Sequence, residues 1–437
     1  MDSSLRVIVT GLIAQHPCLG GVAWDYLQYP LGLARLGHDV YYFEDSGEWP
    51  YNLDGGPSGD DWVVRDCSAN VRHLEAVMSR YGLGDRWAYR FPLSGEWHGI
   101  ADAKRKELLN SADLLINVSG SLEHPERYRG AAKLVYIDSD PIFTQIKLAK
   151  RADEFSKRVD AHDGFFTFGE CLPQTLPAFH CEWRATRQPI VLSEWEPIQD
   201  KINCEVFTTV MSWTSYPPLE YGGRKYGQKD MEFRRFLDLP ARVQPVAMEI
   251  SLGKLFHIPW QTDDEQLPGT TKRSEKDNLA STVHERLTRA GWRVVDAMET
   301  CGDMDRYREY IQRSKAEWSV AKNGYVQGRP GWFSCRSACY LAAGKPVVVE
   351  DTGFSAVLPT GEGILAFNTQ DEAVAAIQEV NRNYAKHAEN ARALAKEYFD
   401  SEKVLTRLIA DSLHRERQPQ GDESSGLVKL ARACDNT

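Results

Sequence analysis

Several signatures of common protein classes are missing from this chain of 437 residues. No apolar run approaches the roughly 20 residues that span a bilayer, so we expect no membrane helix. The chain has no GxGxxG, Walker or GxSxG motif and no zinc-ligand spacing. The usual sequence signals of dinucleotide, P-loop, hydrolase and zinc sites are therefore absent.

Cysteine use and charge narrow the class further. The nine cysteines form no CxxC pair, and the N-terminal residues run directly into a predicted strand without a signal-peptide pattern. We therefore expect reduced thiols in a cytoplasmic protein. The net charge of −10 argues against broad electrostatic binding of nucleic acid, and the 12 tryptophans suit a ligand cleft.

The length and the order of the predicted elements indicate two α/β domains. A chain of this size suits two domains of about 200 residues each. Apolar strands alternate with helices, which is typical of a doubly wound sheet. The predicted strands are 5–12, 40–44, 113–118, 133–138 and 164–168, then 204–213, 246–252 and 292–297. A turn-rich, charged segment at 189–203 predicts a hinge between domains at 1–196 and 204–400, and 418–437 is expected to be a flexible tail.

The stretch 317–360 has the pattern of an anion site. We predict a strand at 319–326, a glycine turn at 328–331, and a helix at 335–343 with Ser334 as its N-cap. A strand at 347–349 follows. A helix that begins after a glycine-rich turn presents free backbone N–H groups to an anion, and Arg336 and Ser337 add a guanidinium and a hydroxyl in its first turn. The pattern suits a diphosphate site, although any βαβ unit would share the helix.

Residues 342–354, AAGKPVVVEDTGF, resemble the donor-sugar-nucleotide motif of GT-B glycosyltransferases. The resemblance is strongest to glycogen-synthase-like retaining enzymes and spore-maturation-type glycosyltransferases. It implies two facing Rossmann-like domains with a cleft between them, and a last helix, about 401–415, that packs back on the first domain. It also implies metal-independent transfer from a nucleotide diphosphate sugar, most suitably a UDP-sugar, with no bound cofactor. The retaining group usually has a Glu where this chain has Cys339, which leaves the stereochemistry open.

A basic segment is the second feature of the resemblance. Retaining GT-B enzymes carry an Arg and a Lys with four residues between them, after the first strand of the second domain. Arg224 and Lys229 have that spacing. Both cations would neutralise the donor diphosphate and the charge that develops as it departs. The alternative is a solvated basic loop.

Further residues of the same half follow predicted strand ends, where α/β sheets bind ligands. Tyr325 is suited to stack on a base or to pack, and Glu350 to hold sugar hydroxyls. The predicted donor-binding set is Gly20, Gly21, Arg224, Lys229, Lys322, Asn323, Tyr325, Ser334, Arg336, Ser337, Glu350, Asp351, Thr352 and Gly353.

Two residues of the first half are candidates for catalysis. His16 follows the first strand, in a loop that carries the paired glycines and faces the cleft in GT-B enzymes, and a histidine there can deprotonate an acceptor hydroxyl. Asp138-Ser139-Asp140 ends another strand and matches the DxD metal-diphosphate motif of GT-A enzymes. A GT-A domain would leave the second α/β half unexplained. We therefore interpret this DxD as a cleft-lining loop, with Asp140 as a base or acceptor contact.

The leading hypothesis is a GT-B glycosyltransferase that moves a sugar to a hydroxyl or other nucleophile. The first domain would bind a small-molecule, glycan or nucleic-acid-derived acceptor through the loops at 14–24, 44–61 and 138–144. The alternatives are a UDP-sugar 2-epimerase of the same fold, a DNA-modifying glycosyltransferase, a metal-dependent DxD enzyme and a binding protein. The sequence leaves the sugar, the acceptor and the oligomeric state open.

Overall fold

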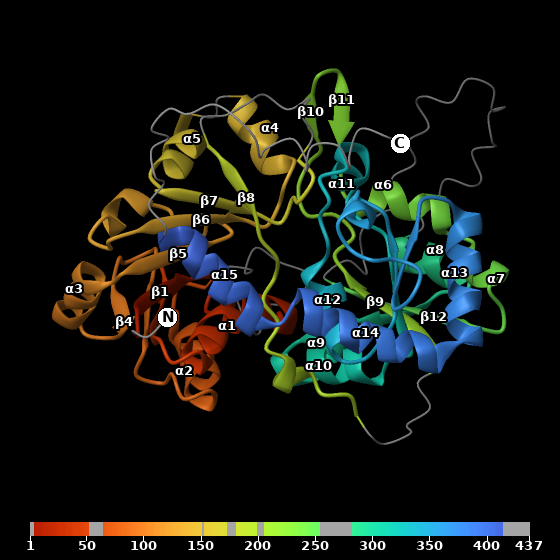
Figure 1. Ribbon diagram of the computed structural model, residues 1–437, viewed down its shortest axis with the longest axis horizontal. Coiled ribbons are helices and arrows are strands. Elements are labelled where there is room, and N and C mark those ends of the chain that lie inside the picture. The colour runs from red at the N-terminus through yellow and green to blue at the C-terminus, as the bar shows by residue number, and fades with distance from the viewer. Residues whose placement is uncertain are drawn as a thin grey trace, which may run out of the picture.

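The computed structural model describes residues 4–51, 64–150, 153–172, 181–198, 205–253 and 282–413. The predicted tail at 418–437, residues 52–61 of the predicted acceptor loop and residues 199–203 of the predicted hinge lie outside the described residues. Two lobes lie side by side, each built on its own sheet with helices on both faces (Figure 1). Among the described residues, no helix is long and apolar enough to cross a membrane.

The first lobe has an eight-stranded sheet in the described region, in the order β4-β3-β2-β1-β5-β6-β7-β8. All neighbours are parallel except β3 and β4. Its strands are β1 (Arg6–Thr10), β2 (Asp39–Glu44), β3 (Trp87–Arg90), β4 (Trp97–Gly99), β5 (Leu114–Val118), β6 (Leu134–Asp138), β7 (Gly164–Thr167) and β8 (Trp183–Ala185). Its helices are α1 (Gly20–Arg35), α2 (Ser68–Arg80), α3 (Asp102–Ser111), α4 (Phe143–Ala149) and α5 (Asp153–Asp160).

The second lobe has a parallel six-stranded sheet in its described part, in the order β13-β12-β9-β14-β15-β16. The strand order reverses between β9 and β14, as it does between β1 and β5 in the first lobe. These are the switch points where doubly wound sheets bind ligands. The strands are β9 (Val206–Met211), β12 (Ala247–Leu252), β13 (Arg293–Asp296), β14 (Ala316–Ser319), β15 (Val347–Glu350) and β16 (Ile364–Phe367), and β10 (Leu219–Tyr221) and β11 (Arg224–Tyr226) form a separate hairpin.

The helices of the second half cover both faces of this sheet, and the last one returns to the first lobe. They are α6 (Lys229–Phe233), α7 (Leu239–Arg242), α8 (Val283–Arg289), α9 (Ala297–Cys301), α10 (Met304–Arg313), α11 (Asn323–Gly328), α12 (Cys335–Ala342), α13 (Gln370–Arg382), α14 (Tyr384–Tyr398) and α15 (Ser401–Leu413). Helix α15 packs along α1, where Gly32 leaves room for the side chain of Leu405 (Figure 1).

The predicted strand at 319–326 is wrong. Strand β14 ends at Ser319, and α11 begins at Asn323. The Ala321 N–H donates to the Glu350 carboxylate (3.0 Å) instead of to a neighbouring strand, and the Asn323 side chain bonds to the Gly227 backbone and to Glu232. A short apolar run fits a buried helix as well as a strand, so periodicity could not separate the two.

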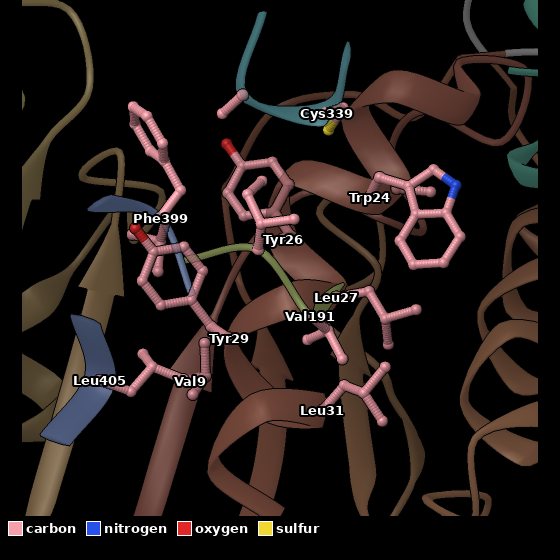
Figure 2. Packing of buried hydrophobic residues seen from close by; sticks show 14 of the residues in the cluster. Val9, Trp24, Tyr26, Leu27, Tyr29, Leu31, Val191, Cys339, Phe399 and Leu405 are labelled. Carbon is pink, nitrogen blue, oxygen red and sulfur yellow. The ribbon is translucent and has the colours of Figure 1, made fainter. Parts of the chain in front are cut away.

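Helix α1 lies at the centre of a hydrophobic cluster that continues from one lobe into the other. Its side chains include Trp24 and Tyr29, which are fully buried. In Figure 2, Tyr29 lies on the side of Leu405 of α15, and Trp24 lies on the other side, next to Cys339 of α12. The lobes therefore share packed apolar surface along α1, and this packing fixes the orientation of α1 relative to the second sheet.

A first seam between the lobes joins α1 to α10. A Cβ atom on Gly20 would lie 2.0 Å from the Asp303 carbonyl oxygen, and one on Gly21 would lie 3.0 Å from the Tyr307 ring. The Trp24 indole N–H donates to the carbonyl of Met304 (2.9 Å). The paired glycines therefore allow two helices to meet closely.

A second seam joins the loop after β6 and the start of α4 to α11. The Lys322 ammonium pairs with Asp140 (2.8 Å). A Cβ atom on Gly324 would lie 2.4 Å from the Phe143 ring, and one on Gly328 would lie 2.6 Å from Ile142. The first seam is therefore largely apolar, whereas the second includes a partly buried ion pair.

Candidate active site

A cavity of about 310 Å³ lies between the lobes. The first lobe contributes the start of α1 to its wall. The second lobe contributes the carboxyl ends of β9 and β12, together with α6, α9, α10 and α12. Its charged lining residues in the described region are Asp25, Lys229, Lys322 and Arg336. The cavity therefore lies at the switch point of the second sheet and is predominantly cationic.

Lys229 is the least compensated of these cations. No hydrogen bond or ion pair joins its ammonium to another residue in the described ranges. Burial, with the positive charges of Arg336 and Lys322 nearby, lowers its pKa well below the usual value, and Glu317 only partly opposes them. An anion in the cavity would relieve this repulsion.

Arg336 and Lys322 carry counter-charges. The Arg336 guanidinium donates to the buried Glu317 carboxylate (2.5 Å), to the Val210 carbonyl (2.7 Å) and to the Ser319 hydroxyl (2.7 Å). These bonds fix the guanidinium at the start of α12. Lys322 pairs with Asp140 and lies near the ring of Tyr216.

The N-terminus of α12 adds backbone donors at this position. Ser334 is the N-cap residue but makes no side-chain capping bond, so it leaves the first N–H groups of the helix without that acceptor. The hydroxyl of Ser337 is buried and has no hydrogen-bond partner among the described residues. Ser334, Arg336 and Ser337 also line a smaller hollow beside the main cavity. Three kinds of predicted hydrogen-bond donor thus lie together at the start of α12: backbone N–H groups, a hydroxyl and a guanidinium.

Arg224 is not part of this group. It lies on β11, opposite Tyr221, at the exposed turn of the hairpin, and does not line the cavity. The hairpin is an insertion between β9 and α6, and it carries Arg224 away from the strand end. Lys229 begins α6 and returns to the cavity, so the Arg–Lys spacing in the sequence does not bring the two cations together.

The first-lobe loop places its predicted residues differently. Gly21 lines the cavity, whereas Gly20 lies against Asp303 at the first seam. His16 stacks on Tyr51, with 4.7 Å between ring centroids, and does not line the cavity. The loop is held by Glu44, which accepts from the backbone N–H groups of residues 14 and 15.

The carboxylates of the DxD segment are occupied by other contacts. Asp138 is buried and accepts from Thr144, Gln145, Thr167 and the Asp140 backbone N–H. Within the described part of the chain, no group of three or more His, Cys, Asp or Glu residues is arranged to hold a metal ion. This geometry gives Asp138 a structural role in the loop.

Asp140 is held just as firmly. Its carboxylate accepts from Lys322 (2.8 Å), from the Tyr216 hydroxyl (2.5 Å) and from the Tyr325 hydroxyl. Burial alone would raise the pKa of Asp140, but the Lys322 charge and the two hydroxyls outweigh it and hold the pKa below its usual range. An acceptor proton would therefore have little tendency to move to this group.

Other predicted donor-binding residues support the loops around α12. Asp351 accepts from the Gly353 N–H (2.9 Å) and from Arg329 (2.8 Å), and Thr352 donates to the Trp332 carbonyl. Gly353 adopts a positive φ of 94°, which favours glycine. These contacts join the turn after β15 to Arg329 and Trp332, which lie in the segment that leads into α12.

Glu350, Asn323 and Tyr325 do not line the main cavity, although Glu350 lines the smaller hollow. Burial and the Glu232 charge raise the pKa of Glu350 to about 9, even though Arg235 pairs with it. Asn323 bonds to Glu232 (2.7 Å). Tyr325 is buried and stacks on Trp332, with ring centroids 4.3 Å apart, so it packs and its ring is not open to a base.

Asp25 is a cavity residue that the sequence reasoning missed. It lies on α1, and its carboxylate has no hydrogen bond to another residue in the described segments. Burial raises its pKa to about 7, with Arg336 partly opposing. One signal was available in the sequence, since Asp25 is the sole charged residue of α1 before Arg35.

Known proteins resemble this chain in one sequence segment and in the whole fold. Residues 278–410 match a family model described as glycosyl transferase-like. No curated protein sequence matches the chain. An alpha-glucosyltransferase solved with UDP is 10% identical, with a TM-score of 0.55 over 94% of this chain and 100% of that one.

Two further structures share the architecture. An alpha-glucosyltransferase solved with UDP-glucose and DNA containing an abasic site is 11% identical, with a TM-score of 0.55 over 94% of this chain and 100% of that one. HepE of Anabaena, solved with UDP and glucose, is 12% identical, with a TM-score of 0.52 over 93% and 99% of the two chains. These likenesses confirm the predicted GT-B fold of two facing Rossmann-like domains. The matched segment also makes residues 278–410 similar in sequence to glycosyl transferase-like proteins.

Proposed function

We propose that the protein transfers a sugar from a UDP-sugar to a hydroxyl of an acceptor, without a metal ion. The second domain, 204–400, binds the donor, and the first domain, 1–196, presents the acceptor. Support for UDP comes from the GT-B neighbours that were solved with UDP or UDP-glucose. The cavity volume lies at the lower end of the range typical of small-molecule sites.

The observation that carries this proposal is the uncompensated charge of Lys229. A partly buried ammonium without an ion partner costs folding free energy unless a ligand supplies the opposite charge. Arg336 and Lys322 add positive charge to the same wall. A diphosphate supplies two adjacent negative groups, which is the chemistry that this set of cations recognises.

The same charges act on the leaving group. As the bond between the sugar carbon and the diphosphate oxygen breaks, negative charge accumulates on the diphosphate. Lys229, the fixed guanidinium of Arg336 and the N–H groups at the start of α12 stabilise that charge more strongly than they stabilise the bound ester. Fixed cations and a helix N-terminus thus take the part that a divalent ion plays in DxD enzymes.

The test is a titration followed by a turnover assay. Calorimetry with UDP, with ADP and TDP as comparisons, should show binding that weakens as salt increases, because the contacts are ionic. A panel of UDP-sugars is then incubated with the protein, with and without EDTA, and released UDP and sugar are measured. We expect EDTA-insensitive release. EDTA-sensitive release would contradict metal independence, and inversion at the sugar C2 without an acceptor would identify an epimerase. UDP binding without turnover of any sugar nucleotide would indicate a binding protein.

A further inference from the structure

Asp25 is the acidic residue among the described cavity-lining residues, and it faces the three cations from the opposite lobe. It is partly buried, and its position is fixed by the packing of α1. Its backbone carbonyl accepts from Gln188 (2.9 Å), whereas its carboxylate makes no hydrogen bond in the described segments. Both carboxylate oxygens are therefore free to accept a proton or a hydroxyl.

The surroundings of Asp25 bring the pKa of its carboxyl group close to neutral pH. Removal from water raises the pKa of Asp25 to about 7, and the Arg336 charge opposes this shift only in part. Titratable and charged groups face it from every packed element. They are Tyr26 and Tyr29 of α1, Tyr307 of α10, Arg336, Cys335 and Cys339 of α12, and, across the cavity, Lys229, Lys322 and Cys301.

We propose that Asp25 is the proton acceptor of the transfer and that the departing diphosphate draws the proton onto it. This inference rests on the proposed donor function. The acceptor O–H bond breaks and a bond forms from that oxygen to the sugar carbon. The bond from the sugar carbon to the diphosphate oxygen breaks, and its electron pair stays on the diphosphate. The proton moves to the Asp25 carboxylate and later leaves to solvent.

The charge balance explains why the two events are coupled. A free diphosphate carries one more negative charge than the sugar ester from which it came. In a cavity of this size that charge develops beside Asp25 and raises its affinity for a proton. The bound ester, with less charge, leaves Asp25 more readily ionised. The carboxylate is therefore basic when the transfer needs a base.

Other carboxylates and the loop histidine are less suited to this role. Asp140 accepts from Lys322 and two tyrosine hydroxyls, and its pKa is held low. Glu44 shares the raised pKa of about 7, because it is buried, but it accepts from two backbone N–H groups of the first loop and does not line the cavity. His16 also lies outside the cavity lining.

The decisive measurement is the number of protons taken up when UDP binds. UDP is titrated calorimetrically into the full-length protein and into Asp25→Asn at pH 7, in two buffers of different ionisation enthalpy. Lys229 and UDP itself also exchange protons, so the difference between the two proteins is the observable. A carboxylate that is half ionised at pH 7 can take up at most about 0.5 proton, and a rise of one unit in its pKa gives about 0.4, so we expect the wild type to take up about 0.4 proton more than D25N.

The affinities give an independent readout. D25N removes a negative charge near the diphosphate, so it should bind UDP about tenfold more tightly than the wild type at pH 8.5 and equally at pH 5.5, as expected for a linkage of one pKa unit. Glu402→Gln is the control, because it removes an exposed carboxylate of α15 outside the cavity. It should leave proton uptake and UDP affinity unchanged.

Turnover completes the test. With the UDP-sugar that reacts in the panel, D25N should slow UDP release about a hundredfold, and Asp25→Glu should recover part of the rate. If the wild type fails to bind UDP, the proposed donor function falls, and this inference falls with it. If both proteins bind UDP but proton uptake, affinity and rate are the same, Asp25 is not the proton acceptor, while the donor site stands.

Discussion

Replacing Lys229 by methionine should move donor affinity and fold stability in opposite directions. The side chain lines the cavity, and its ammonium has no ion partner in the described region. Its pKa is lowered because burial and the charges of Arg336 and Lys322 disfavour the charged form. Methionine keeps most of the side-chain volume and removes the charge. The protein without ligand should therefore gain about 1 kcal/mol in free energy of unfolding, since the residue is only partly buried.

The loss in binding is expected to be larger than the gain in stability. A hydrogen bond to a charged group contributes about 1.5–3 kcal/mol, which corresponds to a roughly 10- to 150-fold weaker affinity for UDP. The gain in stability also has a defined pH dependence. When the pKa of a lysine is lowered in the folded state, the full destabilisation applies at pH values below that pKa. The penalty then disappears as the pH rises towards 10.5, the pKa of lysine in the unfolded chain. The difference between K229M and the wild type should thus shrink in alkaline buffer.

Urea unfolding without ligand and calorimetric titration with UDP check both halves of this prediction. Arg224→Met is the matched control, because it removes an exposed cation five residues away in the sequence that does not line the cavity. It should leave UDP affinity within about twofold of the wild type, as surface charges contribute little. The reasoning is refuted if K229M retains UDP affinity, or if R224M loses as much affinity as K229M.

Two further substitutions test the first seam between the lobes and the raised pKa of the buried Glu350. Gly20→Ala should lower the free energy of unfolding by about 1–3 kcal/mol in urea melts, because the new methyl group meets the Asp303 carbonyl, whereas Gly164→Ala, with its nearest neighbour at 3.4 Å, should cost less. Glu350→Gln should become increasingly more stable than the wild type as the pH rises from about 4.5 to about 9, because the wild-type fold binds a proton there that the unfolded chain has lost. Equal pH profiles for E350Q and the wild type would show that Glu350 is ionised in the fold.

The sequence predicts the α12 region well because its signals are local. A glycine turn, an N-cap serine, eight residues of helix and a β-branched strand follow one another between 328 and 350, and each signal depends on near neighbours. The same locality explains the failure at 319–326. The residues that turn this segment into a helix are Glu232 and Glu350, which approach it from other parts of the chain.

The charged partners of the cavity could not be predicted from local patterns. Lys322 and Asp140 are 182 residues apart, and no periodicity links them. Arg224 and Lys229 are near in sequence but separate in space, because an inserted hairpin lies between strand and helix. The spacing of two residues in the sequence predicts that they share a site only when each directly follows a strand or helix, with no insertion between them.

Asp25 and Asp140 show how the mode of positioning decides what a carboxylate can do. Asp140 is held by hydrogen bonds, so its oxygens already accept from Lys322, Tyr216 and Tyr325. Asp25 is held by the packing of its helix, through the close contact at Gly20 and the indole bond of Trp24. Packing fixes the backbone without using the carboxylate. A carboxylate that is placed precisely but has free oxygens can take up a proton during a reaction, and at Asp25 the contact between the two lobes creates such a group.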